Sequence, residues 1–143
     1  YIKVETLPVT AKVQAMSAAV DGRLTIFGGA GGSYFIEEMR RGADGTMPFC
    51  SQPDDFVAVW DAFQRGDEAT ARTRFDATIM AINRLGNQGG DVFYHIHKQL
   101  LVRRGTIRGS LVRSPTTPPD AITQREIDEL LAQIVPTPVA FRG

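Results

Sequence analysis

The sequence predicts an α/β fold with parallel strands, followed by a helical segment. Three short apolar runs alternate with helical patterns up to about residue 65, and the loops between them are short. This β-α-β-α-β-α order favours parallel strands that are joined by right-handed helical crossovers. After residue 65 the strand signals stop and only helical patterns follow. We therefore expect two parts, residues 1–65 and residues 66–143.

The three apolar runs each have the composition of a short strand. Tyr1–Glu5 reads YIKVE, Leu24–Phe27 reads LTIF, and Gly45–Phe49 reads GTMPF. The first run alternates with period two, which is typical of a strand. Pro48 weakens the third prediction, because proline has no N–H to donate to a neighbouring strand. Since three strands do not form a covered parallel sheet, either the sheet is completed elsewhere or it forms a small open unit.

Apolar periodicity predicts six helices. They are expected at about residues 10–20, 33–41, 54–65, 67–85, 91–104 and 123–134. Asp54 or Asp55 is expected to cap the third helix and Thr123 the last, because these residue types favour the first position of a helix. A proline-rich connector, Ser114–Asp120, precedes the last helix.

Composition excludes several classes of protein. The chain has 143 residues, with 16 Lys and Arg against 16 Asp and Glu, and this balance argues against a nucleic-acid binder. The single Cys50 excludes a multi-cysteine zinc site, and we expect it to be a buried, inert thiol. No apolar run approaches the roughly 18 residues of a membrane span, and no secretory signal pattern is visible. We expect a cytoplasmic protein that uses no metal ion and no cofactor.

Lys3 is the most informative single residue for chemistry. On a strand, Tyr1, Lys3 and Glu5 point to one face, and Ile2 and Val4 point to the other. Both faces of a parallel sheet are normally covered, and burying an ammonium group is costly. A neutral amine in such a place can attack a carbonyl group and form a Schiff base, with Glu5 as its partner or proton relay. The alternative is a solvent-facing ion pair between Lys3 and Glu5 on an edge strand.

The segment FGGAGG, residues 27–32, follows a strand and opens a helix. Glycines let a ligand approach the backbone, and the N-terminus of a helix favours anions. The spacing of these glycines differs from that of the dinucleotide-binding fingerprint. The segment is therefore interpreted either as a cradle for a carboxylate or phosphate group, or as a flexible strand-to-helix turn.

Several segments, in a fixed order, resemble a known family. They read YIKVETLP, FGGAGG, EEMRRGADGTMPF, FQRGDEATAR, LLVRRG and VRSPTTPP. Together they resemble the C-terminal half of the dihydrodipicolinate synthase / N-acetylneuraminate lyase family, over the chain to about residue 134. The resemblance implies a TIM (β/α)8 barrel, with residues 1–65 as strands 6–8 and residues 66–143 as a helical extension. The N-terminal half of the barrel would precede Tyr1, so we expect the chain to be part of a longer enzyme.

The resemblance also implies roles for individual residues. Lys3 matches the family's Schiff-base lysine, and Gly28 matches the glycine that ends the seventh strand near the bound keto acid. Gly29 joins Gly28 as an expected substrate-binding residue. Met47 matches an apolar residue that lines the site on the eighth strand. Glu5 is the candidate acid–base group, and it departs from many synthases, which have glutamate directly after the lysine.

Four functional hypotheses follow. The first is a Schiff-base-forming lyase or aldolase that acts on pyruvate or a related 2-oxo acid. The second is a dehydratase of a 2-keto-3-deoxy sugar acid on the same scaffold, which the spacing of Lys3 and Glu5 favours. The third is a non-catalytic homologue that binds a keto acid, and the fourth is a free-standing α/β binding domain. For the enzyme we expect a small 2-oxo acid as partner, neither nucleic acid nor membrane, and a homodimer or homotetramer.

Overall fold

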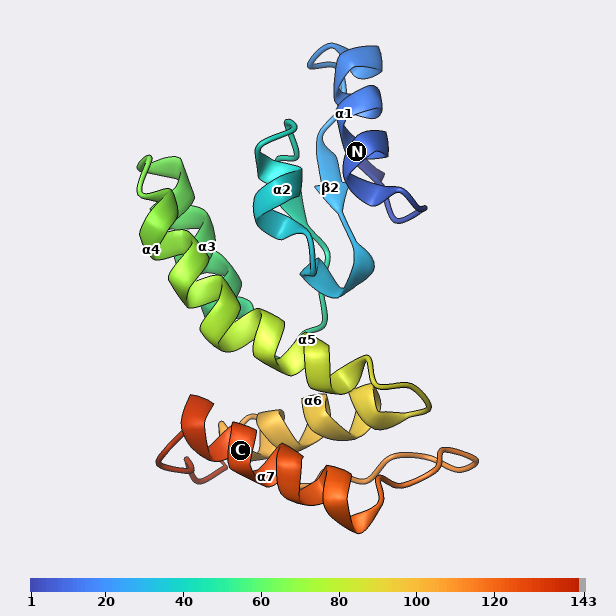
Figure 1. Cartoon of the computed structure of the whole chain (residues 1–143), viewed down its shortest axis with the longest axis vertical. Coiled ribbons are helices and arrows are strands. Elements are labelled where there is room, and N and C mark those ends of the chain that lie inside the picture. The colour runs from blue at the N-terminus through green and yellow to red at the C-terminus, as the bar shows by residue number, and fades with distance from the viewer. Residues whose placement is uncertain (142–143) are drawn as a thin grey trace. The chain divides into compact units, whose positions relative to one another are not determined.

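The computed structural model describes residues 1–141 of the chain (Figure 1). Its packing divides the chain into two compact units. The N-terminal unit comprises Tyr1–Phe49 and Asp54–Phe75, and the C-terminal unit comprises Cys50–Pro53 and the chain from Asp76 onward. The units are thus interleaved along the sequence. The assignment of residues 1–65 to a barrel and of residues 66–143 to an extension stays a prediction.

A three-stranded parallel sheet organises the N-terminal unit. Its strands are β1 (Ile2–Lys3), β2 (Ile26–Gly28) and β3 (Gly45–Thr46), in the order β1-β2-β3. Both pairings are parallel, with Lys3 opposite Phe27 and Phe27 opposite Gly45. The predicted parallel α/β arrangement is therefore confirmed for these strands. The strands are shorter than predicted.

The third strand ends before the proline that weakened its prediction. β3 stops at Thr46, and the next backbone amide, that of Met47, donates to the carbonyl oxygen of Gly28 at 3.1 Å. Pro48 follows outside this pairing, where its missing N–H removes no hydrogen bond from the sheet.

Four α-helices accompany the sheet in this part of the chain. They are α1 (Val9–Val20), α2 (Phe35–Met39), α3 (Pro53–Gln64) and α4 (Glu68–Phe75). α3 begins at Pro53, whose fixed φ suits the first helical position. Asp54 and Asp55 therefore lie in the first turn of α3 and do not precede it as caps, which corrects the predicted start.

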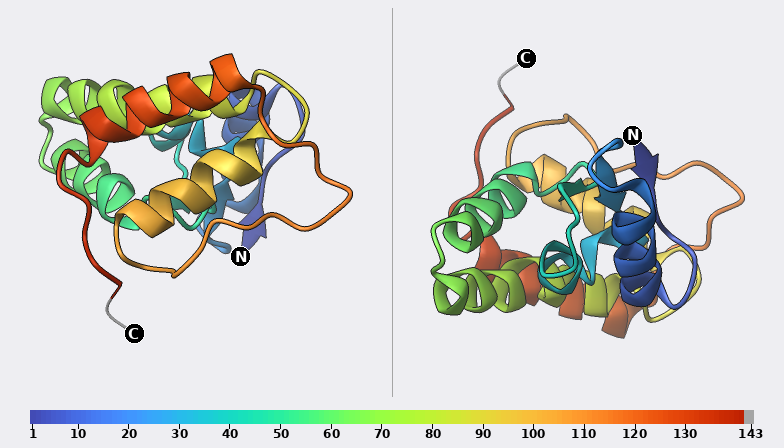
Figure 2. Two further views of the ribbon diagram at one scale, coloured as in Figure 1. Left: turned by 90° about the horizontal axis from the view of Figure 1, so that it is seen from below. Right: turned by 90° about the horizontal axis from the view of Figure 1, so that it is seen from above.

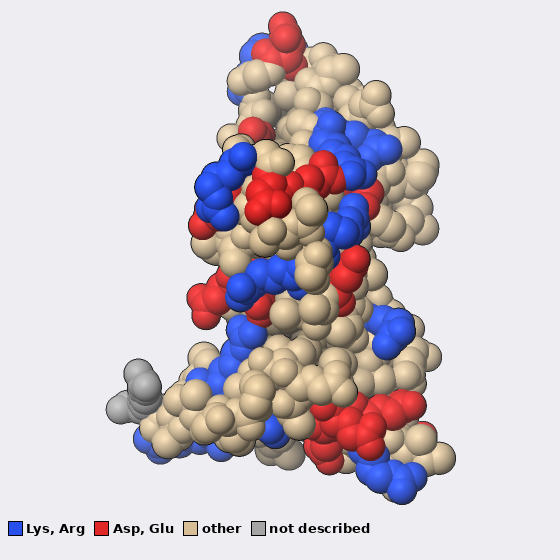
Figure 3. All heavy atoms as spheres, turned by 60° about the vertical axis from the view of Figure 1, so that its left-hand side comes forward, with Lys and Arg blue, Asp and Glu red and all other residues tan. Residues whose placement is uncertain are grey.

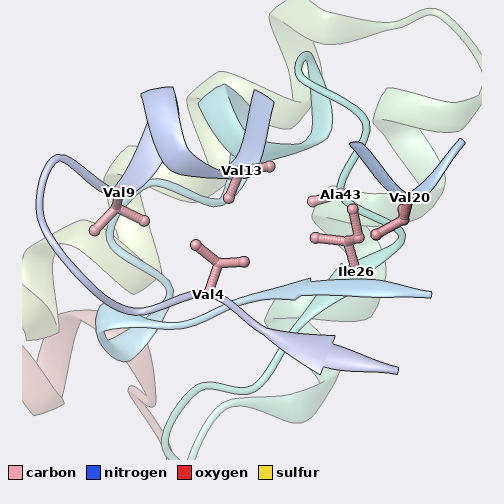
Figure 4. Packing of buried hydrophobic residues seen from close by; sticks show 6 residues of the cluster. All are labelled: Val4, Val9, Val13, Val20, Ile26 and Ala43. Atoms are coloured by element: carbon pink, nitrogen blue, oxygen red, sulfur yellow. The ribbon is translucent and has the colours of Figure 1, made fainter. Parts of the chain in front are cut away.

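The helix α1 packs on one face of the sheet. Six buried apolar side chains from β2, α1 and the segments beside β1 and β3 point toward one another (Figure 4): Val4, Val9, Val13, Val20, Ile26 and Ala43. Because side chains alternate along a strand, Lys3 and Phe27 point to the opposite face of the sheet from Val4 and Ile26. The packing of α1 thus fixes which face carries the candidate lysine.

The predicted helix at 67–85 is one helical run with a local change of winding. α4 is followed by the π-helical segment η2 (Asp76–Met80) and then by α5 (Ala81–Gly86). A single π-helical turn inside a longer helix contains the same residue types as an α-helix, so the sequence pattern predicts one continuous α-helix here. The passage from the N-terminal to the C-terminal unit falls between Phe75 and Asp76, at the start of η2.

The C-terminal unit is helical. Its other helices are α6 (Val92–Arg103) and α7 (Ala121–Ile134), and residues 106–120 form an extended connection between them (Figure 2). Its core draws on three helices, α5, α6 and α7, through Ile82, Leu85, Ile96, Leu100, Ile127 and Leu131. Within each helix these positions are three or four residues apart, so they share one helix face.

The cap of α7 differs from the predicted one. Asp120 precedes the helix, and its Oδ1 accepts hydrogen bonds from the backbone amides of Ile122 at 2.8 Å and Thr123 at 2.9 Å. Thr123 is therefore the third helical residue, and the prediction that it caps the helix was wrong. Asp and Thr are both favoured at the N-cap position, so the sequence alone did not show which of the two caps α7.

Ion pairs join three helices of the N-terminal unit. Arg40, at the end of α2, pairs with Glu68 of α4, Arg72 of α4 pairs with Glu37 of α2, and Arg74 of α4 pairs with Asp55 of α3. Positive and negative side chains are interspersed over the face drawn in Figure 3. Among the helices that the structure describes, none is long and apolar enough to cross a bilayer.

Candidate active site

The carboxyl ends of the three strands bring the predicted site residues to one edge of the sheet. Lys3 ends β1, Gly28 ends β2, and Met47 directly follows β3. In parallel strands these ends lie at the same edge, which is where α/β folds place their active sites. Met47 is bound through its backbone to Gly28, and its side chain is partly exposed.

Lys3 and Glu5 form an ion pair. Lys3 Nζ lies 3.0 Å from Glu5 Oε2, and both side chains are partly exposed. Glu5 Oε1 accepts a hydrogen bond of 3.0 Å from the backbone amide of Ala30. The pKa of Glu5 is lowered, first by the hydrogen bond from Lys3 and then by that from Ala30. The carboxylate is thus held between the lysine and the turn after β2.

This arrangement has a clear chemical capacity. A lysine attacks a carbonyl carbon only as the neutral amine. A carboxylate oxygen 3.0 Å from Nζ is within reach to accept the ammonium proton. The same pair also fits the alternative of a solvent-facing edge-strand ion pair, so the geometry agrees with both interpretations made from the sequence.

Gly29 lies directly against this pair. A Cβ atom at Gly29 would be 2.9 Å from Lys3 Cε and 3.0 Å from Glu5 Cδ. Real Cβ atoms almost never approach other heavy atoms this closely, so any side chain here would displace the pair. The predicted residues Lys3, Glu5 and Gly29 are therefore brought together.

Gly28 faces the other side of the strand. A Cβ atom at Gly28 would overlap the carboxyl group of Glu38, which belongs to α2. Gly28 therefore leaves room for a helix side chain behind the strand, while its neighbour Gly29 leaves room for Lys3 in front. The absence of a side chain at Gly28 serves the packing of Glu38.

Glu38 is the ionisable group that the sequence analysis missed. It is fully buried, at 0% exposure, and neither carboxyl oxygen has a hydrogen-bond partner among the described residues. Burial raises the pKa of Glu38 to about 7, and the charges of Glu37 and Glu5 act in the same direction, while the nearby Gly29 amide opposes them. One signal was available, since Glu38 follows the buried Phe35 by three residues and so shares its helix face.

Two aromatic residues were also missed. Phe27 is the register partner of Lys3 and therefore lies on the same face of the sheet. The ring of Tyr1 meets that of Phe27 edge to face, with centroids 5.9 Å apart. A Cβ atom at Gly45 would be 3.0 Å from the ring of Phe27, so this ring lies over the neighbouring strand. Aromatic surface thus adjoins the candidate lysine.

Outside the Lys3 site, the described residues include a serine–histidine pair and an exposed cysteine. Among residues 1–141, no group of three or more His, Cys, Asp or Glu side chains is placed to hold a metal ion. In the C-terminal unit, Ser51 Oγ lies 2.6 Å from Nδ1 of the buried His97, and burial lowers the pKa of His97 to about 4. Cys50 is exposed, so the prediction of a buried thiol was wrong.

The chain is similar to solved enzyme structures. A dihydrodipicolinate synthase from Rhodopseudomonas palustris superposes with a TM-score of 0.79 and 32% sequence identity, over 92% of this chain and 44% of that one. This chain belongs to the dihydrodipicolinate synthase / N-acetylneuraminate lyase family. Members of the family are TIM-barrel enzymes, and the three-stranded parallel sheet is consistent with part of such a barrel.

Two further members of the family share the fold at lower identity. Wild-type sialic acid aldolase from Ruminococcus gnavus has a TM-score of 0.72 and 20% identity, over 87% of this chain and 42% of that one. A dihydrodipicolinate synthase from Oceanobacillus iheyensis has a TM-score of 0.73 and 18% identity, over 92% of this chain and 46% of that one. The chain therefore spans less than half the length of each of these solved relatives. No protein-family model and no curated protein sequence matches it.

Proposed function

We propose that this chain carries the nucleophile of a Schiff-base-forming lyase that acts on pyruvate or a related 2-oxo acid. The observation that carries the proposal is Lys3, at the carboxyl end of β1 and 3.0 Å from a carboxylate. Family membership supports it, because the sialic acid aldolase from Ruminococcus gnavus has a catalytic lysine, and a structure of the mutant at that lysine is among the similar structures. Lys3 is our candidate for the corresponding residue.

The proposed reaction begins at Lys3. Its neutral amine attacks C2 of the 2-oxo acid, and loss of water from the resulting carbinolamine leaves an iminium. The iminium accepts the electron pair when the C3–C4 bond breaks, which releases an aldehyde and leaves an enamine. Protonation at C3 and hydrolysis by water then release pyruvate and restore Lys3. In the synthetic direction the same steps run in reverse.

Glu5 is the proposed acid–base group for these proton transfers. Its carboxylate is held by Lys3 and by the Ala30 amide, so it is ionised and oriented before substrate binds. It can take the proton from the ammonium form of Lys3, and it can receive the proton of the C4 hydroxyl when the aldehyde forms. Gly28, Gly29 and Met47 remain the proposed substrate-binding residues.

The dehydratase hypothesis stays as the second candidate. The iminium also acidifies C3, and loss of the C3 proton and of a C4 hydroxyl group releases water from a 2-keto-3-deoxy sugar acid. A carboxyl group beside the lysine suits this reaction, because the leaving hydroxyl needs a proton. The proximity of Glu5 to Lys3 is the observation that favours it.

The remaining expectations belong to this proposal. We propose that the sheet corresponds to strands 6–8 of the barrel, and that the whole protein is a cytoplasmic homodimer or homotetramer that uses no cofactor. Its partner is a small 2-oxo acid rather than nucleic acid or a membrane. Two hypotheses remain if the proposal fails. They are a non-catalytic keto-acid-binding homologue and a free-standing α/β binding domain.

Turnover of 2-oxo acids by the full protein tests the function. We expect the wild type to release pyruvate and an aldehyde, or a dehydrated semialdehyde if it is a dehydratase. Lys3→Arg should lower the rate at least roughly 10³-fold, because an always-protonated guanidinium cannot attack the carbonyl. Lys12→Arg is the matched control, since Lys12 is exposed and bonded to Thr6. Ligand binding without turnover in the wild type would support the non-catalytic homologue.

A further inference from the structure

A buried carboxyl group lies directly behind the candidate site. Glu38 has no exposed surface, and its carboxyl group occupies the space that a side chain at Gly28 would fill. Its two oxygens have no hydrogen-bond partner among the described residues. Burying an unpaired carboxylate is costly, so such a group is normally protonated. A buried polar group without a partner also calls for an explanation, such as a functional role.

We propose that Glu38 is a positioning residue, which holds a proton behind the Gly28–Ala30 turn and thereby sets the geometry of the Lys3–Glu5 pair. The proposal rests on the function proposed above, to which it adds a residue and a pH dependence. Glu38 does not touch the Lys3 face of the sheet. It acts through the backbone of the Gly28–Ala30 turn, which lies against Glu38 on one face of the sheet and against Lys3 and Glu5 on the other.

Three consecutive backbone positions make this connection. Gly28 contacts the carboxyl group of Glu38, Gly29 contacts both Lys3 and Glu5, and the Ala30 amide donates to Glu5 Oε1 at 3.0 Å. A shift of this turn toward α2 would therefore move the hydrogen-bond donor of Glu5 and the surface on which the pair rests. Gly28 and Gly29 have no side chain that would resist such a shift, whereas the side chain of Ala30 packs against the core cluster around Val4.

A second polar group without a partner lies on the same side of the sheet. Thr46 is the register partner of Gly28, so its side chain points to the face on which Glu38 lies. Thr46 Oγ1 is buried and has no hydrogen-bond partner among the described residues. A hydroxyl group and a neutral carboxyl group each both donate and accept hydrogen bonds, so they suit one another better than a hydroxyl suits an isolated charge.

The charged groups around Glu38 explain the direction of the effect. Glu37, on its own helix, and Glu5, in front of the strand, both disfavour a second negative charge at this position. Glu37 pairs with Arg72 of α4, which limits the compensation that this arginine offers to Glu38. The only ionisable side chain of α1, that of Lys12, is exposed and bonded to Thr6.

The strand β3, which pairs with β2, and the helix α3 add little net charge near Glu38. β3 has no ionisable side chain, and Asp44, which precedes it, accepts a hydrogen bond from the Ile26 amide at 2.8 Å. On α3, Asp55 pairs with Arg74. Ionisation of Glu38 therefore adds a negative charge that repels Glu5 and attracts the Gly29 amide, so we expect the Lys3–Glu5 pair to be disturbed when Glu38 loses its proton.

The test compares trapping of the pyruvate iminium by borohydride in the full wild-type protein and in Glu38→Gln. Glutamine mimics the protonated acid, so the two rates should agree below about pH 6. Above about pH 8 the wild type should fall behind the variant by at least roughly fivefold, the lower end of typical coupling between linked sites. Glu68→Gln is the control, because Glu68 pairs with Arg40 away from the turn and should keep the wild-type profile.

A second readout is independent of activity and of the folding of any variant. In the wild type, the NMR signals of the Gly29 and Ala30 amides should shift with pH around a midpoint near 7. Equal trapping rates at every pH, or amide signals without that midpoint, would overturn the role of Glu38. Failure of the wild type to trap pyruvate at any pH would overturn the proposed function instead, and the amide titration would still decide on Glu38.

Discussion

At the residue scale, the candidate site depends on the Lys3 amine, the Glu5 carboxylate and the absence of a side chain at Gly29. Lys3 and Glu5 share one face of β1 and its continuation, as the period of two predicts, and they form an ion pair of 3.0 Å. Exposed ion pairs contribute only about 0–1 kcal/mol to stability. The pair therefore contributes little to folding, and its value lies in where it places an amine and a proton acceptor.

Gly29→Ala tests the contact between the turn and the pair. The added Cβ would be 2.9 Å from Lys3 Cε, so we expect the pair to be displaced and turnover to fall by about 10²-fold, as misplacements of about 1 Å do. Steady-state kinetics measures this loss, and thermal unfolding shows that the fold is retained. Gly109→Ala is the control, since a Cβ there meets open space. Unchanged turnover in Gly29→Ala would contradict the described contact.

Glu38 also predicts how stability depends on pH. Its pKa is about 7 in the folded chain, against an ordinary value of 4.5, so between these values the folded state binds a proton that the unfolded state releases. The free energy of unfolding therefore falls by up to about 3 kcal/mol as the pH rises through this window. Above the window it no longer changes through Glu38. Urea unfolding of the wild type across this window measures the fall.

The control for this fall is Glu38→Gln, which cannot titrate. The wild type should lose stability relative to the variant as the pH rises from about 4.5 to about 7. His97, whose pKa burial lowers to about 4, contributes a slope of opposite sign, but it is present in both proteins and cancels in their difference. Parallel stability profiles for the two proteins would rule out the buried acid.

At the element scale, the N-terminal cap of α7 gives a direct test. Asp120 accepts two backbone amides of the first turn, and these bonds lower the pKa of its carboxyl group. Asp120→Ala should therefore destabilise the chain, because it removes the acceptor of both amides. The urea unfolding midpoint measures the change. Glu129→Ala, at an exposed position of the same helix, should change stability by less than about 0.5 kcal/mol.

The elements could be predicted where side-chain patterns determine them. Short apolar runs located all three strands, and apolar periodicity located the helices of both units. The patterns could not give the short length of the strands, because backbone pairing with a neighbour decides where a strand ends. Nor could they show η2, whose residues have the composition of an ordinary α-helix.

The candidate site could be predicted only in part, for a similar reason. Alternation along one strand places Lys3 beside Glu5 without knowledge of any other element. The contact of Gly29 with that pair depends on how the turn after β2 folds back, and the burial of Glu38 depends on the packing of α2 behind Gly28. Both are contacts between segments, which a sequence pattern does not contain.

At the scale of the whole molecule, the sheet is the feature that connects fold and function. β1 and β3 each have one strand neighbour among the described residues, so each leaves an edge that a further strand of a barrel could pair with. The chain covers 44% of the Rhodopseudomonas palustris dihydrodipicolinate synthase, and the relatives of its family are barrels. A barrel around Lys3 therefore stays part of the proposed function.

The most direct test of the central claim is covalent trapping on Lys3. The full protein is incubated with pyruvate, reduced with borohydride and digested, and the peptides are mapped by mass spectrometry. A Schiff base is reduced to a stable secondary amine, so we predict a pyruvate-derived mass increase on Lys3 and none on Lys12 or Lys98. The absence of an adduct on Lys3, or an adduct on another lysine in its place, would contradict the account.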